Sequence, residues 1–470
     1  MNRKLKKFAV TAGLVGMTLL FPPETADAAE IVRIDLNSSI ERALRNNRDI
    51  EQSARDRDTA KWYYSRSRRQ MGPKLSWNSS YMHIGGRDYS GYRELHDYYG
   101  DKYHPSYDNE FTNVIGLEMP LYTGGQQESE IGSARYRMNY ADLALENTRQ
   151  EIKYQTTAAY YQILQRRALV RVEEEAVNLL QEHLNNVTIQ YEVGTVAKSD
   201  VLASKVQLAA RRQSLVTANG NYLNAIADLN NLIGLDVDTV LVAEEELGYK
   251  KYNVTLNECI DYALENRPDG AAADYAIKQA EMNLKGSKSG YRPNLTAVAE
   301  KNVSGEGSFS QNHSEAWNIG VRMTWNIFDN GVTTAQSNEA KSELEKEKSK
   351  ALQVREKIRL EVSKAYNDLV AAEKNITITS EAIKMAEEDY SIAQLRYLEG
   401  IDTNLSVMDA QEKLTEAQTN YYNALYSYNI AAAALDKARG IPVNINVPLY
   451  VSAEKMTKSP DKALKKSQIN

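Results

Sequence analysis

Apolar positions recur every seven residues along two long stretches of the chain, and each stretch is followed by a glycine and a shorter stretch of the same kind. A seven-residue repeat of this length predicts helices that pack as an antiparallel coiled coil. No proline interrupts positions 121–267 or 294–441, so long helices are sterically possible there. One helix from about 126 to 190 would be about 100 Å long, and Gly194 and Gly400 suit the turns between paired helices. The apolar ladders are Met138, Leu145, Ile152 and Ala159; Val201, Leu208, Leu215, Tyr222 and Leu229; Leu344, Ala351, Ile358 and Ala365; and Val407, Leu414, Tyr421, Tyr428 and Leu435.

Four shorter stretches alternate with period two instead. Apolar-out, polar-in alternation over about ten residues is typical of a strand in a membrane β-barrel, but a soluble hairpin with one buried face shows the same pattern. Four strands cannot close a barrel, since about eight are the minimum, so membrane strands would require several chains to share one barrel. The alternating faces are Leu75, Trp77, Ser79 and Tyr81; Phe111, Asn113, Ile115, Leu117, Met119 and Leu121; Leu295, Ala297 and Ala299; and Trp317, Ile319, Val321, Met323, Trp325 and Ile327.

The two halves of the chain repeat one another. Leu36–Leu75 aligns without a gap on Leu256–Leu295, and Tyr122–Gly234 aligns in the same way on Phe328–Gly440. Two copies of one helix, hairpin and coiled-coil unit therefore follow each other. Each copy is predicted to open with a single helix, at about 36–70 and 256–288. The predicted organisation is a signal peptide at 1–28, a first repeat at 29–234, a linker at 235–255, a second repeat at 256–440 and a C-terminal tail at 441–470, which is disordered or wraps the outside of the helices.

The N-terminus has the layout of a secretory signal peptide. Arg3–Lys7 is basic, Phe8–Phe21 is apolar, and Ala26–Ala28 fits a small-residue cleavage site before Ala29. The alternative is an N-terminal membrane anchor, although the apolar run is short beside the roughly 20 residues of a membrane span. No other stretch is apolar enough to cross a bilayer as a helix, so a membrane location would require strands.

Composition removes several classes of function. The net charge of −6 gives no electrostatic case for nucleic acid as a partner, and Cys259 is the only cysteine, which rules out an intramolecular disulfide. In the tyrosine-rich segment 87–109, His96 and His104 could bind a metal with nearby aspartates, but the spacing is loose and a solvated polar loop is the plainer interpretation. No phosphate-binding loop or nucleophile elbow occurs. We therefore predict no catalytic site, no cofactor and no enzyme.

The repeated unit resembles the TolC family of outer-membrane efflux and secretion channels over residues 34–441. The resemblance implies a mainly helical homotrimer, in which four strands per subunit form a shared 12-stranded barrel in outer-membrane lipid and twelve helices form a tunnel across the periplasm. It also implies an exit duct for efflux or type I-like secretion, docked to a periplasmic adaptor protein and an inner-membrane transporter. The motifs that carry it are Leu256-x3-Ile260-x2-Ala263-Leu264-x-Asn266-x-Pro268, Tyr291-Arg292-Pro293-x-Leu295 and Trp325-Asn326-Ile327-Phe328-Asp329-x-Gly331.

The resemblance maps the family's periplasmic gate onto the two glycine turns, at Tyr191–Asp200 and Tyr397–Asp409. In this mapping the first helix pair is the outer one and the second is the inner one. Ser199 and Asp200 would link the outer pair to the inner pair, including Tyr397.

Two gate positions depart from the best-known family member. Asp402 stands where that member has an arginine, so closure must be held differently. Of that member's two pore-facing aspartates, one turn apart, the first is Ser406 here and the second is Asp409. Asp409 alone would give a threefold ring of carboxylates, which attracts cations at a narrow neck. Plainer roles stay open: Asp409 as an exposed coiled-coil residue, Asp200 as a helix N-cap, and Tyr397 as a packing residue.

Two other classes of protein share parts of this pattern. An exported coiled-coil structural or adhesive protein would fold its hairpins onto its own helices and form no channel. A periplasmic adaptor would need a small β-domain between its helical arms, which the ungapped duplication excludes. The prediction is therefore an outer-membrane exit duct, with the structural or adhesive protein as the alternative.

Overall fold

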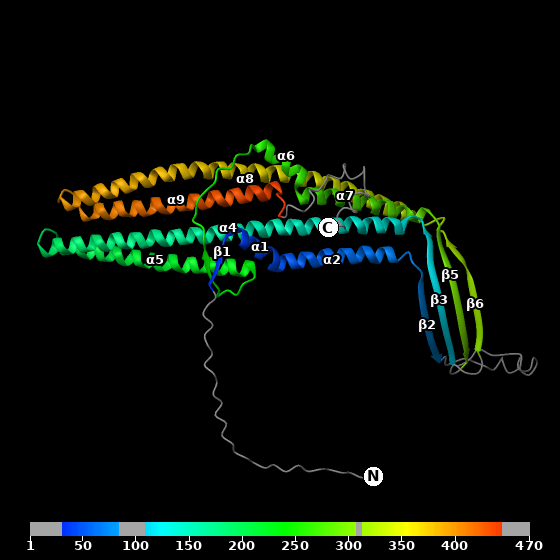
Figure 1. Cartoon of the computed structure of the whole chain (residues 1–470). Coiled ribbons are helices and arrows are strands. Elements are labelled where there is room, and N and C mark those ends of the chain that lie inside the picture. Colours follow the sequence, from blue (N-terminus) through cyan, green and yellow to red (C-terminus); the bar gives the residue numbers. More distant parts are fainter. Residues whose placement is uncertain (1–30, 84–108, 307–312, 444–470) are drawn as a thin grey trace, which may run out of the picture.

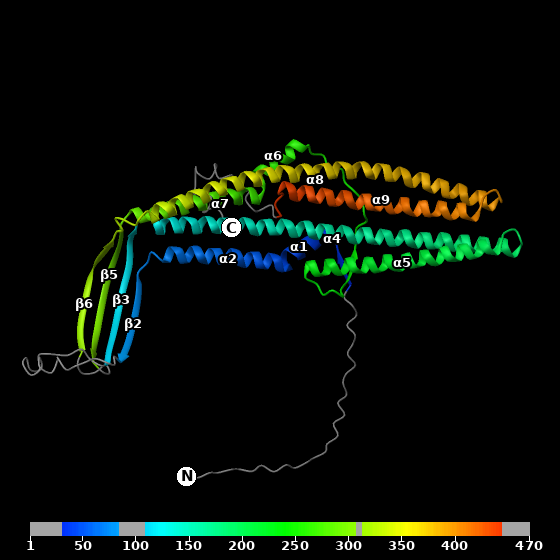
Figure 2. The same cartoon turned by 180° about the vertical axis from the view of Figure 1, so that it is seen from behind.

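The computed structural model of the protein describes residues 31–83, 109–306 and 313–443. The predicted signal peptide, the pair His96 and His104, and the tail beyond residue 443 lie outside these residues. The described chain is elongated: long helices run side by side and a four-stranded sheet lies at one end (Figures 1 and 2). The opposite end consists of two helical hairpin tips.

Both repeats form the predicted helices and strands. Across the described residues, no helix contains an apolar run long enough to pass through a bilayer. In chain order the elements are β1 (Ile31–Ile34), α1 (Leu36–Asn46), α2 (Arg48–Arg69), β2 (Lys74–His83), β3 (Asn109–Thr123), α4 (Gln126–Glu192), α5 (Lys198–Ile233), β4 (Val240–Ala243), α6 (Leu256–Asn266), α7 (Pro268–Ser287), the 3-10 helix η2 (Lys288–Tyr291), β5 (Asn294–Glu306), β6 (His313–Thr324), α8 (Val332–Leu398) and α9 (Asn404–Arg439).

The long helices pair as the seven-residue ladders predict. Helices α4 and α8 have 67 residues each, which is about 100 Å, and they fold back as α5 and α9 with 36 residues each. Within the first hairpin Ile152 and Leu229 are buried, and within the second Ile358, Tyr428 and Leu435 are buried. Helix α4 also packs against α2, α7 and α9, so it is the central element of the subunit.

The predicted single helices at 36–70 and 256–288 are wrong in one respect, because each is broken into two. The breaks fall at Asn47 and Arg267, which are extended with ψ near 130°. The Asn47 side chain caps α2 and donates a hydrogen bond to the carbonyl of Leu232 at 3.2 Å. Arg267 precedes a proline and donates to the carbonyl of Ala438 at 3.2 Å. Each break thus satisfies a free carbonyl in the last turn of a returning helix.

The four longer strands form one antiparallel sheet in the order β2-β3-β5-β6. Most of its apolar face is exposed: Trp77 is 69% exposed, Trp317 77% and Ile319 74%, whereas Phe111 near one end of β3 is buried. A soluble hairpin with a buried face, and hairpins folded onto the chain's own helices, are both inconsistent with this exposure. Strand β6 ends at Thr324, so Trp325 and Ile327 of the predicted alternating face lie beyond the strand.

A second, small sheet was not predicted. Strand β1 pairs in parallel with β4, which lies in the predicted linker between the repeats. Ile34 and Leu241 of this pair are buried in the core of the first hairpin. The pairing attaches the start of the described chain to the junction of the two halves.

Two glycines of similar backbone geometry have different surroundings. Gly400 and Gly440 both have φ of +73°, but a Cβ at Gly440 would lie 2.9 Å from the Cα of Arg267, whereas one at Gly400 would meet nothing within 4 Å. We expect Gly400→Ala to cost about 1–2 kcal/mol, the penalty of a left-handed alanine, and Gly440→Ala to cost more. Thermal unfolding followed by circular dichroism would test this; equal losses would contradict it.

Candidate gate at the hairpin tips

The two tips are built alike. Gly194 has φ of +83° and Gly400 has φ of +73°. In each turn the glycine N–H donates to the carbonyl of the residue three positions earlier, and the next N–H donates to a carbonyl five positions earlier. This is the Schellman geometry that ends a helix at a left-handed residue. The turns are exposed, so both are free to contact other molecules.

One asparagine joins the first hairpin to the second, just above the tips. Asn404 begins α9, and its amide nitrogen donates to the backbone carbonyl of Asp200 at 3.2 Å. Its amide oxygen lies 2.6 Å from Nε2 of His183 and accepts from the Ser204 hydroxyl at 3.2 Å. Because the amide oxygen can only accept, Nε2 of His183 carries the hydrogen. The junction therefore holds a buried histidine whose Nε2 hydrogen is bonded to Asn404.

Tyr397 lies at this junction as a packing residue. It is 5% exposed, and its ring centroid lies 5.2 Å from that of His183. Burial raises the pKa of Tyr397, and the nearby Asp200 carboxylate raises it further. Among the described residues, its buried hydroxyl has no hydrogen-bond partner. Asp200 reaches the second hairpin through its backbone carbonyl rather than through a bond to this hydroxyl.

The alternative role of Asp200 as a helix N-cap is wrong. Helix α5 begins at Lys198 with Ala197 at the cap position, and Asp200 is the third residue of the helix. A carboxylate there is still favoured by the helix dipole. Ser199 is exposed, and among the described contacts its side chain makes no hydrogen bond to the second hairpin.

Asp402 bonds to its own hairpin. It accepts from the Thr403 N–H at 2.8 Å and lies 3.5 Å from Nε of Arg396. A hydrogen bond from Ser406, with the Thr403 N–H and the Arg396 charge, lowers the pKa of Asp402. Thr403 caps α9, with its hydroxyl 3.0 Å from that of Ser406. Asp409 follows on α9 and is exposed.

The sequence did not point to His183 or Asn404 as partners. They are 221 residues apart, and neither stands at a repeated position: the second-repeat counterpart of His183 is Asp389, and the first-repeat counterpart of Asn404 is Lys198. Only the three-dimensional pairing of the hairpins shows them. Within the described part of the chain, no three His, Cys, Asp or Glu side chains are grouped to hold a metal ion.

Comparison with known proteins gives the same architecture. The Outer membrane efflux protein family matches residues 39–235 and 259–440. The outer membrane efflux protein BepC of Brucella suis is 24% identical over 72% of this chain and 74% of its own length. The outer membrane protein TolC of Escherichia coli is 19% identical over 91% of this chain and 85% of its own. The Campylobacter jejuni CmeC outer membrane channel has a TM-score of 0.76 at 17% identity, covering 92% of this chain and 89% of that one.

This fold of long paired helices with a sheet at one end is shared with the Campylobacter jejuni channel. The family match covers most of both repeats. The chain belongs to the outer membrane efflux protein family, whose members are channel proteins, and the predicted resemblance to the TolC family is confirmed.

The buried histidine gives a pH dependence. Burial lowers the pKa of His183 below its ordinary 6.5, partly offset by the bond to Asn404. Between the folded and unfolded pKa values the unfolded chain binds a proton that the folded chain does not, so stability falls as the pH falls below 6.5. The loss is at most about 1.4 kcal/mol per pH unit.

We expect this loss in the wild type but not in His183→Gln, which keeps an N–H donor and cannot titrate. The test is the difference in melting temperature between the two proteins from pH 7.5 to 5. Carboxylates titrate alike in both, so their contribution cancels. Parallel curves would exclude the effect.

Proposed function

We propose that three copies of this chain form one duct, with a shared 12-stranded barrel in the outer membrane and a helical tunnel across the periplasm. The four-stranded sheet is the main support for this proposal. Its apolar face is exposed, and among the described elements β2 and β6 are each paired on one side only. Hydrocarbon does not tolerate unpaired strand edges, so β6 of one copy pairing with β2 of the next would complete the hydrogen bonding.

The helical part supports the same association. Helices α5 and α8 are at the outer positions of the two packed hairpins, because α4 and α9 contact each other between them. Both carry exposed apolar ladders with seven-residue spacing. These ladders are Leu202, Ala209, Val216 and Leu223 on α5, and Ala371, Ile378, Met385 and Ile392 on α8. Apolar seams of this kind are what a neighbouring coiled-coil helix covers.

The duct works with partners. We infer that a periplasmic adaptor and an inner-membrane transporter dock at the hairpin tips and supply the energy for transport, as the resemblance to the TolC family implies. The relative BepC is named as an efflux protein, which supports export of substrates through this duct. The two exposed glycine turns are the surface offered to such partners.

The tips form the gate in this proposal. Ser199, Asp200 and Tyr397 lie where the two hairpins meet, and Asp402 holds the inner turn in shape. Asp409, with Ser406 one turn earlier, faces the pore. Threefold symmetry then places about three carboxylates at the neck, which favours cations.

A charge on the α8 ladder should prevent assembly. Ile392→Glu would bury a carboxylate between subunits, which costs several kcal/mol, so we expect trimers to be lost. Ser391→Glu is the matched control, since Ser391 is the exposed neighbour off the ladder. Crosslinking and unboiled gels of detergent-extracted protein give the measurement. A stable trimer of Ile392→Glu would contradict this contact.

The wild-type protein should form cation-preferring pores in planar bilayers. Asp409→Asn should lower the cation-to-anion permeability ratio by about twofold or more, because it removes the charge at the neck. Asp228→Asn is the control: it makes the same change about 45 Å from the tip along α5. An unchanged ratio removes Asp409 from the pore, and a wild type that opens no pores overturns the function itself.

A further inference from the structure

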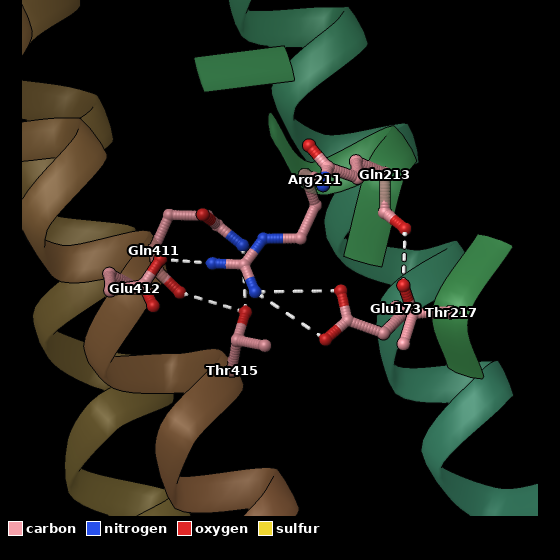
Figure 3. Close-up of polar contacts among 7 residues, drawn as sticks. All are labelled: Glu173, Arg211, Gln213, Thr217, Gln411, Glu412 and Thr415. Carbon is pink, nitrogen blue, oxygen red and sulfur yellow. Dashed lines mark hydrogen bonds and ion pairs between the residues drawn. The ribbon is translucent and has the colours of Figure 1, made fainter. Parts of the chain in front are cut away.

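A buried arginine lies between the two hairpins, about 10 Å along α5 from Ser204. Nη1 of Arg211 lies 3.4 Å from a carboxylate oxygen of Glu173 on α4, and Nη2 contacts Glu412 on α9 (Figure 3). Beside it, Gln411 donates to the Thr415 hydroxyl at 2.8 Å. One guanidinium thus binds an acid of each hairpin.

The two acids are exposed to different extents. The Arg211 side chain is 10% exposed and that of Glu173 is 17% exposed, whereas that of Glu412 is 54% exposed. Water can therefore hydrate Glu412 when it leaves the arginine, while Glu173 keeps the buried guanidinium paired. Of the two bonds, the one between the hairpins, to the more exposed Glu412, is therefore the easier to break.

Other polar contacts also cross this seam. Asn404 bonds to the first hairpin nearer the tips, and Gln418 donates to Glu175 at 3.4 Å. Gln165 donates to Asn423 at 2.7 Å, a neutral pair. Among the described ion pairs, α4 and α9 are also joined by Glu151 and Lys437, but Lys437 lies 25 residues further along α9 than Glu412, away from the tips. Among the described ion pairs, Arg211 with Glu412 is thus the one that joins the hairpins near the gate.

The link exists in one repeat only. The offset that aligns the repeats places Thr379 at the counterpart of Glu173 and Ala417 at the counterpart of Arg211. Packing of a hairpin therefore does not require the pair. Arg211 occurs in the first hairpin alone and contacts Glu412 of the second, which indicates a role between the two hairpins.

We propose that Arg211 is a positioning residue that holds the second hairpin against the first in the closed duct. Opening requires Glu412 to separate from Arg211. This accounts for closure without a basic residue at position 402, since Asp402 bonds within its own turn. The inference rests on the proposed channel function.

Single-channel recording of the full chain in planar bilayers tests it. We expect Arg211→Gln to raise the resting open probability about tenfold or more, because the pull on Glu412 is lost. Arg212→Gln is the matched control: Arg212 is exposed and bonds to Gln181 of its own hairpin. It should gate like the wild type.

Two further variants separate gating from folding. Glu412→Gln keeps the buried Arg211–Glu173 pair, so it should assemble and should also be leaky, even where Arg211→Gln fails to fold. Ile152→Val, which removes one buried methylene from the core of the first hairpin, should melt earlier yet gate normally. Trimeric, pore-forming Glu412→Gln that closes like the wild type overturns the proposal. A wild type without pores overturns the channel function instead.

Discussion

The whole molecule depends on the hydrogen bonding at the two edges of the four-stranded sheet. A sheet with one apolar, exposed face and strands β2 and β6 at its ends is unsuited to water and, as a single copy, to lipid. Association is thus a condition of stability. The long helices favour association as well. Within the described chain, no other element covers the apolar ladders on α5 and α8.

The helical part combines two kinds of contact. Within each hairpin the ladders pack apolar side chains, as at Ile152 and Tyr428. Between the hairpins polar contacts are frequent, as at Asn404 and Arg211, next to a smaller apolar cluster near the tips. Apolar packing resists shear over its whole length, whereas polar contacts exchange readily for water. Each hairpin is therefore suited to move as a unit.

Much of this fold could be predicted because periodicity is local. The seven-residue spacing predicts the long helices, the period-two alternation predicts the four longer strands, and the duplication predicts their order along the chain. The break at Asn47 was missed although Asn is a good helix cap, because the helical pattern continues on both sides of it. The pairing of β1 with β4, and of Arg211 with Glu412, joins residues about 200 positions apart, and no local pattern encodes such contacts.

The two helix breaks have a mechanical meaning. Asn47 is hydrogen-bonded to the end of α5, and Arg267 is hydrogen-bonded to the end of α9. From this contact to its tip each hairpin extends about 54 Å, the length of a 36-residue helix. If a hairpin tilts by about 5° about its contact, its tip moves by about 5 Å. Small rotations at these two contacts therefore become large displacements at the tips.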